Sequence, residues 1–190
     1  VASLASHILV PACTDDGKTC VFLVERTAAG VLLEAQGTTT GELEYRLKLG
    51  GVTLADSAKL GDGKRDAEML PWMIARTIAG LCATELGVAD RALRMTAAYT
   101  ASRKQFGKPI ATFQAVAQRA ADAYIDLEAM RLSTTQAIWR LASGLDASRE
   151  LAIAKFWAAE GGHRVCYAAQ HLHGGIGVDT DYPLHHYYLK

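Results

Sequence analysis

The first third of the chain alternates short apolar stretches with turns. The stretches ILVPA (8–12) and VFLV (21–24) flank TDDGKT, whose Asp-Gly pair is typical of a hairpin turn. Gly30 precedes a further apolar stretch, VLLEA, and a turn rich in Gly and Thr leads into YRLKL, where apolar and polar residues alternate. The pattern predicts several antiparallel strands that end at KLGDGK, a loop with two glycines.

Near residue 64 the pattern changes to that of long amphipathic helices in an alanine-rich background. We expect helices over about residues 66–101 and 112–142, and a third helix that runs to about residue 173. Thr112 is a candidate cap for the second helix, and Gly144 is expected to end it. Either Asp146 or Ser148 caps the third helix, which a Gly-Gly-Ile-Gly run stops.

The second of these helices has the clearest apolar stripe. Its expected members are Phe113, Val116, Ala117, Ala120, Tyr124, Leu127, Met130, Thr134, Ile138 and Leu141. The tail YPLHHYYLK is typical of the start of a fourth helix that the chain does not finish. The order of elements predicts an α+β protein: a partial antiparallel β domain over residues 1–63, then an antiparallel helical bundle over residues 64–190, incomplete at its end.

Composition narrows the classes of function. Half of the 190 residues are hydrophobic, which predicts a folded chain, and 20 basic residues balance 20 acidic ones. The balance gives no indication of nucleic-acid binding, and the apolar runs are too short and too charged to span a membrane. The four cysteines follow no pattern and are expected to be reduced, buried thiols of a cytoplasmic protein. The chain has no secretory signal and starts with Val1, so we expect it to begin inside a longer protein.

The segment ASRKQFGKPIATFQAV (101–116) is the first candidate site. Arg103 and Lys104 end one helix, Gly107 and Pro109 enforce a tight corner, and the next helix begins close behind. A guanidinium beside the amides of a helix N-terminus suits a phosphate oxygen. The alternative is structural, because cations also favour a helix C-terminus and glycine and proline favour a turn.

The glycine run in QHLHGGIGVDTDYP (170–183) is the second candidate. It differs from the dinucleotide fingerprint, since Thr180 occupies the third glycine position and no strand precedes it. The run either lets a ligand approach the backbone closely or only terminates the helix. Five of the six histidines lie in the last quarter of the chain, and His163 and Cys166 are one helical turn apart. No second ligand pair has a zinc-like spacing, so we expect no metal site.

Together, these two segments resemble the signatures of the acyl-CoA dehydrogenases. The segment RKQFGKPI, with Gln114 eleven residues after Arg103, resembles the family's helix–turn–helix signature, and HGGIGVDTDYPLHHYY resembles its second signature. Gly87 and Tyr99 fall where the family's first long helix has a Gly and a Tyr. The resemblance covers nearly the whole chain and is closest to actinobacterial subunits that act in steroid or branched side-chain breakdown.

The resemblance implies an FAD-dependent enzyme that oxidises an acyl-CoA thioester between Cα and Cβ and passes electrons to an electron-transfer flavoprotein. It implies that Arg103 reaches the FAD diphosphate across a subunit interface, with Gln105, Phe106 and Gln114 lining the same site. His171 through Gly175, with Gly174 between them, would close over that FAD. The resemblance also implies a homo- or hetero-oligomer, either a dimer or a tetramer.

The chain departs from the family pattern at three places. His171 stands where the family usually has Gln, and Gln170 lies one residue away. Thr77 occupies one family position of the catalytic Glu, and the other lies further beyond the Tyr-Pro pair than this chain extends, so no base is assigned. Two hypotheses follow: a dehydrogenase that needs further segments or a partner chain, or a non-catalytic subunit that keeps the fold and the interface.

Overall fold

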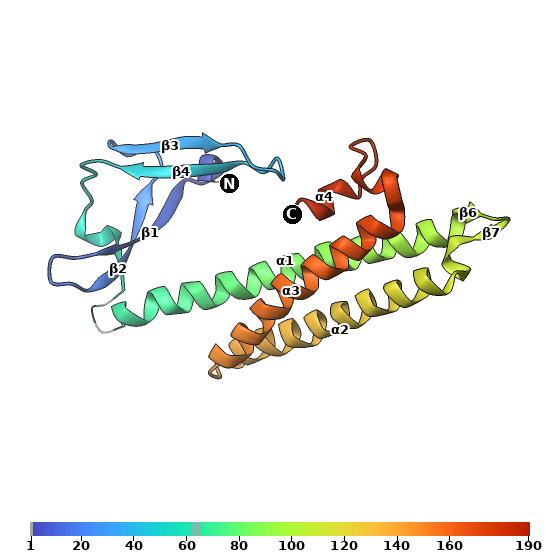
Figure 1. Cartoon of the computed structure of the whole chain (residues 1–190). Coiled ribbons are helices and arrows are strands. Elements are labelled where there is room, and N and C mark those ends of the chain that lie inside the picture. Colours follow the sequence, from blue (N-terminus) through green and yellow to red (C-terminus); the bar gives the residue numbers. More distant parts are fainter. Residues whose placement is uncertain (1, 62, 64) are drawn as a thin grey trace. The chain divides into compact units, whose positions relative to one another are not determined.

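The computed structural model describes residues 2–61, 63 and 65–190. The chain divides into two compact units, Val1–Ile74 and Ala75–Lys190, and helix α1 (Asp66–Ser102) begins in the first and continues through the second. Small antiparallel sheets come before long helices in chain order (Figure 1), so the predicted α+β class is confirmed. The predicted domain boundary after residue 63 stays a prediction.

The first unit contains two antiparallel sheets. The strands are β1 (His7–Cys13), β2 (Thr19–Glu25), β3 (Val31–Gln36), β4 (Glu44–Leu49) and β5 (Lys59–Leu60). One sheet has the order β1-β2-β5, and the other pairs β3 with β4. Short 3-10 helices at Ala2–Leu4 and Asp56–Ala58 complete the unit. Each apolar stretch predicted to be a strand is one.

The Asp-Gly turn between β1 and β2 closes as its sequence predicts. Gly17 has a φ of 79°, a left-handed conformation that glycine adopts without steric cost. The Thr14 N–H donates to the carbonyl oxygen of Lys18 at 2.9 Å, and the Lys18 ammonium lies 2.6 Å from the Asp16 carboxylate. The hydrogen bond from Lys18 holds the pKa of Asp16 below its usual range. Local chemistry alone therefore accounts for this hairpin.

Asp66 connects the start of α1 to the sheet of the first unit. Its buried carboxylate lies 2.6 Å from the Lys59 ammonium, accepts the Gly63 N–H at 3.0 Å and accepts the Cys20 thiol at 3.8 Å. The hydrogen bond from Lys59 lowers the pKa of Asp66, so the carboxylate stays charged at the first residue of the helix. A negative charge there also interacts favourably with the helix dipole.

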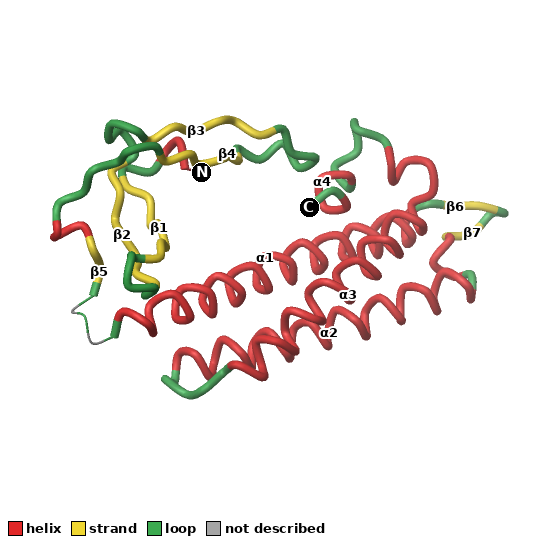
Figure 2. Tube along the Cα trace, turned by 60° about the vertical axis from the view of Figure 1, so that its left-hand side comes forward, coloured by secondary structure: helices red, strands yellow, loops and turns green. Residues whose placement is uncertain are grey.

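The second unit consists of α1 from Ala75 onward and three further helices. These are α2 (Gln114–Ala142), α3 (Ser148–His173) and the short α4 (His185–Tyr188). Consecutive long helices run antiparallel and lie side by side in both views (Figures 1 and 2). A β6–β7 hairpin (Lys104–Gln105 and Lys108–Pro109) and a 3-10 turn (Ile110–Thr112) connect α1 to α2. A second 3-10 turn, Gly174–Val178, follows α3.

Small side chains dominate the core of the bundle, which allows the helices to approach closely. The buried residues that α1, α2 and α3 share include Ala79, Ala89, Ala92, Ala123, Leu127, Met130, Ala137, Ala154, Val165 and Ala169. A Cβ at Gly161 would lie 3.0 Å from Cγ of the fully buried Met130, so this glycine provides room for the methionine. Arg164 of α3 also forms a two-point ion pair with Asp126 of α2, at 2.7 and 2.8 Å.

Several details of the prediction were wrong. Ala117, Tyr124 and Ile138 are exposed, because α2 faces its neighbours with a narrower side than the stripe assumed, whereas Ala123 and Ala137 are buried. Thr112 does not cap α2, since its hydroxyl donates to the carbonyl oxygen of Pro109 at 2.7 Å. All four cysteines are free thiols, but Cys13, at the end of β1, is exposed.

Candidate functional site

The corner between α1 and α2, residues 103–113, has an unusual backbone. The Arg103 N–H donates to the carbonyl oxygen of Tyr99, and the Ile110 N–H donates to the carbonyl oxygen of Arg103, each at 2.8 Å. Phe106 and Gly107 form the tip of the β6–β7 hairpin with φ values of 51° and 78°. Glycine accepts this left-handed conformation freely, whereas a bulky residue pays about 1 kcal/mol for it. The corner therefore holds an aromatic side chain in a strained position.

The side chains of the corner are presented to solvent. Phe106 is 92% exposed and contacts Phe113 edge-on, with 6.2 Å between the ring centroids. The Lys108 ammonium lies 4.8 Å from the centre of the Phe113 ring. Arg103, Lys104 and Lys108 form no ion pair with any carboxylate in the described part of the chain. The exposed Phe106 ring and three cations that form no ion pair with a described carboxylate therefore belong to the same corner.

The N-terminus of α2 adds hydrogen-bond donors to this surface. Phe113 is the N-cap residue, and no side chain caps the helix. The carbonyl oxygen of Phe113 accepts the N–H groups of Val116 and Ala117, while Gln114 is the exposed first residue of the helix. Uncapped amides at a helix start favour an anion. The corner can therefore bind a phosphate oxygen through both charge and backbone donors.

The glycine turn, residues 174–178, is built on His173. The ring of His173 is buried, its Nδ1 lies 2.7 Å from the carbonyl oxygen of Ala169, and its Nε2 lies 3.2 Å from the Tyr182 hydroxyl. Burial lowers the pKa of His173, so the neutral ring donates from Nδ1 and accepts the tyrosine proton at Nε2. Gly174 then turns the chain with a φ of 66°. His173 and Tyr182 hold the two ends of the turn together.

Contacts between aromatic rings bring the two predicted segments to one end of the helical unit. The Tyr99 ring, one helical turn before Arg103, stacks on His173 with 4.5 Å between centroids. The hairpin and the end of α3 lie at the same end of the bundle in both views (Figures 1 and 2). Among the described residues, no hydrogen bond or ion pair joins Gln105 or Gln114 to the exposed His171, Gly174 or Gly175. The exposed side chains of Gln105 and Gln114 and the exposed backbone at Gly174 and Gly175 can therefore contact a ligand.

The remaining candidates from the sequence are Thr77 on α1 and the pair His163 and Cys166 on α3. Thr77, at the position that the resemblance links to a catalytic carboxylate, is exposed on α1. His163 is exposed, whereas the Cys166 thiol is buried, with its pKa raised to about 12, and donates to the carbonyl oxygen of Tyr187 at 3.6 Å. In the described part of the chain, no group of three or more His, Cys, Asp and Glu could hold a metal ion. No described helix is long and apolar enough to cross a bilayer.

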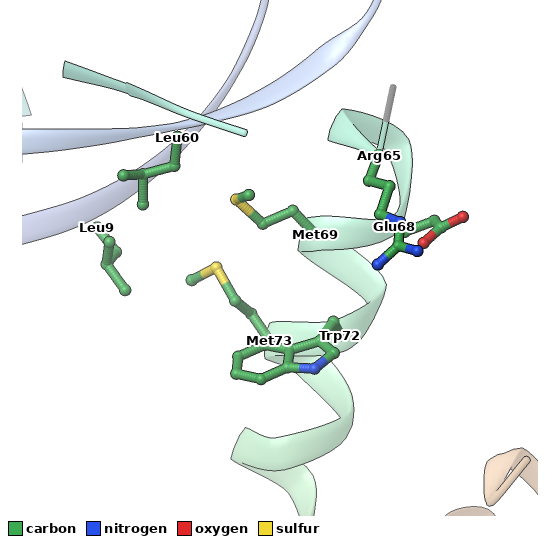
Figure 3. A pocket seen from close by; sticks show the side chains of 7 residues that line it. All are labelled: Leu9, Leu60, Arg65, Glu68, Met69, Trp72 and Met73. Atoms are coloured by element: carbon green, nitrogen blue, oxygen red, sulfur yellow. The ribbon is translucent and has the colours of Figure 1, made fainter. Parts of the chain in front are cut away.

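An apolar pocket in the first unit was not predicted from the sequence. It has a volume of about 400 Å³ and is lined by Leu9, Leu60, Arg65, Glu68, Met69, Trp72 and Met73. Met69 and Met73 extend from α1 toward Leu9 and Leu60, with Trp72 below them (Figure 3). Trp72 is 56% exposed, so these α1 side chains border an open recess.

Comparison with known proteins decides the family. Residues 71–190 match the model of the acyl-CoA dehydrogenase C-terminal domain. The chain belongs to the acyl-CoA dehydrogenase family. The resemblance seen in the sequence is therefore confirmed, and the matched residues contain both the corner and the glycine turn.

Relatives in this family align over nearly the whole chain. It is 43% identical to acyl-CoA dehydrogenase FadE27 of Mycobacterium tuberculosis over 194 residues, which cover 98% of this chain and 51% of the relative. The ChsE4–ChsE5 complex of the same organism contains a chain that is 43% identical with a TM-score of 0.92, covering 99% of this chain and 50% of the other. The FAD complex of PigA is 25% identical with a TM-score of 0.89, at coverages of 99% and 51%. The chain spans about half the length of the curated relatives it matches.

Proposed function

We propose that this chain forms part of an FAD-dependent acyl-CoA dehydrogenase, which oxidises an acyl-CoA thioester between Cα and Cβ. The corner carries the proposal, because its three cations form no ion pair with a described carboxylate and no side chain caps the helix that starts there. Its charge, its N–H donors and its exposed Phe106 ring match the anionic diphosphate and the flat rings of a flavin nucleotide.

The proposed FAD contacts fall into two groups at one end of the bundle. Arg103 is assigned to the diphosphate, and Gln105, Phe106 and Gln114 line the same surface. His171, Gly174 and Gly175 approach the cofactor from the glycine turn, where the absence of a Cβ allows close contact with the backbone. An FAD held by these residues would supply the acceptor for the hydride that leaves the substrate Cβ. Thr77 offers a hydroxyl rather than a carboxylate and is not assigned the role of base.

We further propose that the chain works in a homo- or hetero-oligomer, as a dimer or a tetramer. The ChsE4–ChsE5 relative is a complex of two proteins, which supports an assembly of unlike chains. Acyl-CoA is the proposed substrate, and an electron-transfer flavoprotein is the proposed electron acceptor. A cytoplasmic location belongs to the same proposal and is supported by four free thiols.

Flavin retention by the assembled protein tests the assignment of Arg103. Replacing Arg103 with Ala removes one charge-assisted contact, which should weaken FAD binding by about 1.5–3 kcal/mol, or roughly ten- to a hundredfold. The measurement is the flavin-to-protein absorbance ratio after dialysis, followed by titration with FAD. Arg91→Ala is the matched control, because Arg91 is also exposed on α1 and forms no ion pair with the described residues. Unchanged flavin occupancy in the Arg103 variant would contradict the assignment.

The non-catalytic alternative rests on Thr77, which cannot act as a carboxylate base. The two functions differ in a simple spectroscopic observation. A yellow protein whose flavin absorbance is bleached by an acyl-CoA supports the dehydrogenase. A colourless protein that regains no flavin when partner chains are added supports a structural subunit.

A further inference from the structure

The glycine turn folds back onto the last turn of α3. A Cβ at Gly177 would lie 2.7 Å from the carbonyl oxygen of Gln170 and 3.2 Å from the Cβ of His173. Beyond the turn, the Asp179 N–H donates to the carbonyl oxygen of Ile176, and a bond over three residues does not connect the chain back to α3. The close approach therefore depends on contacts that reach across the turn.

His173 provides such a contact. Its ring is 4% exposed and stacks on Tyr99 of α1, with 4.5 Å between the centroids. Its Nδ1 atom lies 2.7 Å from the carbonyl oxygen of Ala169, and its Nε2 atom lies 3.2 Å from the hydroxyl of Tyr182, nine residues further along the chain. A carbonyl oxygen can only accept, so Nδ1 carries the proton and Nε2 accepts from the tyrosine. One imidazole thus connects α1, α3 and the segment beyond the turn.

The His173 ring faces uncharged groups from each element that it contacts. Tyr99 comes from α1, Tyr182 from the segment beyond the turn and a backbone carbonyl from α3, and tyrosine side chains carry no charge near neutral pH. No described carboxylate forms an ion pair with His173. Two other titratable groups are neighbours in the chain. Arg103 is exposed one helical turn beyond Tyr99, and the Nδ1 atom of His185 lies 2.8 Å from the Tyr182 carbonyl oxygen.

A proton added to this ring meets no group that would stabilise it. Burial lowers the pKa of His173, and the hydrogen bond to the Ala169 carbonyl opposes this only in part. Protonation also places an N–H at Nε2, opposite the Tyr182 hydroxyl, so the tyrosine proton loses its acceptor. Opening the turn would let water solvate the charged ring. The proton therefore binds more tightly when the turn is open than when it is closed.

We propose that His173 is a positioning residue, which holds the glycine turn closed through Tyr182 as a neutral ring and releases the turn as a cation. We call this pair of residues the histidine latch. The inference rests on the proposed function for what the turn holds, because Gly174 and Gly175 are assigned to FAD. Bound flavin should then leave faster in mild acid than at neutral pH.

The direction of the pH dependence follows from the burial of the ring. The folded-state pKa of His173 lies below its ordinary value of 6.5. The stabilisation by the latch is therefore complete above about pH 6.5 and is lost as the pH falls from there through the folded-state pKa. The other five histidines are exposed or half-buried, which makes His173 the buried member of the six.

Amide hydrogen exchange of the full chain tests the latch without any cofactor. Mass spectrometry of peptides over residues 170–183 measures the exchange. After correction for the intrinsic pH dependence, opening of the turn should rise up to about tenfold from about pH 7.5 to about pH 5.5, because one proton is coupled to it. His173→Asn keeps an N–H donor for the Ala169 carbonyl but does not titrate, so its opening should be independent of pH. Tyr182→Phe removes only the hydroxyl and should raise opening at about pH 7.5 roughly fivefold.

His163→Asn and His185→Asn are the matched controls. His163 is exposed on the same helix, and His185 contacts the Tyr182 backbone rather than the His173 ring. Both variants should keep the pH dependence of the wild-type protein. Nitrogen NMR gives a second readout, in which His173 should carry its proton on Nδ1 at about pH 7.5 and titrate below about pH 6.5. Circular dichroism verifies that each variant is folded.

Three results would overturn the inference. The first is a wild-type turn that opens equally at both pH values, and the second is a His173→Asn variant that keeps the wild-type pH dependence. The third is a Tyr182→Phe variant whose turn opens no more than that of the wild-type protein. Each would show that His173 only fills space in the core.

Flavin release, measured with an excess of a flavin-binding apoprotein as a trap, separates this outcome from that of the proposed function. If FAD is bound, its release should be about tenfold faster at about pH 5.5 than at about pH 7.5, and His173→Asn should remove this difference. If no FAD is bound but exchange depends on His173 as expected, the latch stands and the proposed function fails. If Arg103→Ala loses FAD while His173→Asn leaves the pH dependence of release unchanged, the proposed function stands and the latch fails.

Discussion

Glu85 occupies a confined position between α1 and α3. A Cβ at Gly162 of α3 would lie 2.5 Å from the Oε1 atom of Glu85, so the glycine leaves room for the Glu85 carboxyl group. Burial raises the pKa of Glu85, and the charge of Lys190 opposes this shift only in part. No ion pair with another described residue neutralises the charge.

Replacing Glu85 with Gln should stabilise the protein at neutral pH by about 1 kcal/mol, because it removes the charge while keeping the shape. The folded-state pKa is raised, so the carboxyl favours folding when protonated, and that advantage is lost as the pH rises through the folded pKa. The gain from Gln should therefore be largest at about pH 8 and shrink toward pH 4. The measurement is the free energy of unfolding in urea, determined for the wild-type protein and the Glu85→Gln variant between about pH 4 and pH 8.

Glu160→Gln is the control for this measurement, since Glu160 belongs to the same unit and its side chain is 59% exposed. Its effect on the free energy of unfolding should be small and nearly independent of pH. A Glu85 variant whose effect is equally flat would show that burial does not govern this carboxyl.

Local chemistry decides which of these residues the sequence reveals. Arg103, Phe106 and Gly107 lie close together in the sequence, so a cation, an aromatic residue and a glycine indicate a corner without any knowledge of the fold. The contacts of Glu85 with Gly162 and of Arg119 with Tyr167 join helices that are distant in the chain, and no spacing rule connects them. The Gly161–Gly162 pair inside α3 was the one sequence signal that another helix approaches α3 closely there.

At the scale of elements, the glycine turn makes a sharp prediction. A Cβ at Gly177 would lie 2.7 Å from the backbone oxygen of Gln170, whereas a Cβ at Gly175 meets no atom within 4 Å. Backbone atoms cannot rotate away as a side chain can. Gly177→Ala should therefore destabilise the protein by about 1–3 kcal/mol, and Gly175→Ala should be nearly neutral. Thermal melting compares the pair, and equal effects would mean that the turn is looser than its contacts indicate.

The sequence predicted where the helices begin and end, but it did not predict correctly which of their side chains are buried. The predicted ends of α1 and α3 agree with Ser102 and His173 to within one residue, because Arg103 begins the corner and Gly174 ends the apolar pattern. The predicted apolar stripe of α2 included more side chains than the structure buries. Periodicity identifies an apolar side but gives no information on how much of it neighbouring helices cover.

At the scale of the whole molecule, the helical unit exposes a large apolar surface on α2. Ile125, Leu132 and Trp139 recur every seven residues and are 65%, 70% and 58% exposed. A seven-residue spacing keeps them on one side of the helix, as in helices that pack against a partner helix. Exposing such residues to water is unfavourable, at about 25 cal/mol for each Å² of apolar surface. We therefore expect another chain, either a second copy or a related subunit, to cover this stripe.

Replacing Leu132 with Lys should weaken association at least tenfold without harming the fold, because the side chain is already exposed and the change puts a charge into the centre of the stripe. Sedimentation between about 1 and 100 µM measures the dissociation constants of the wild-type and variant proteins. Leu81→Lys is the matched control, since Leu81 is 64% exposed on α1, outside the stripe. If the wild-type chain stays monomeric with its partner chains present, or if both variants dissociate the assembly equally, the stripe is not the interface. Selective loss at Leu132 would place the subunit contact along α2, the helix whose first residues form the proposed flavin surface.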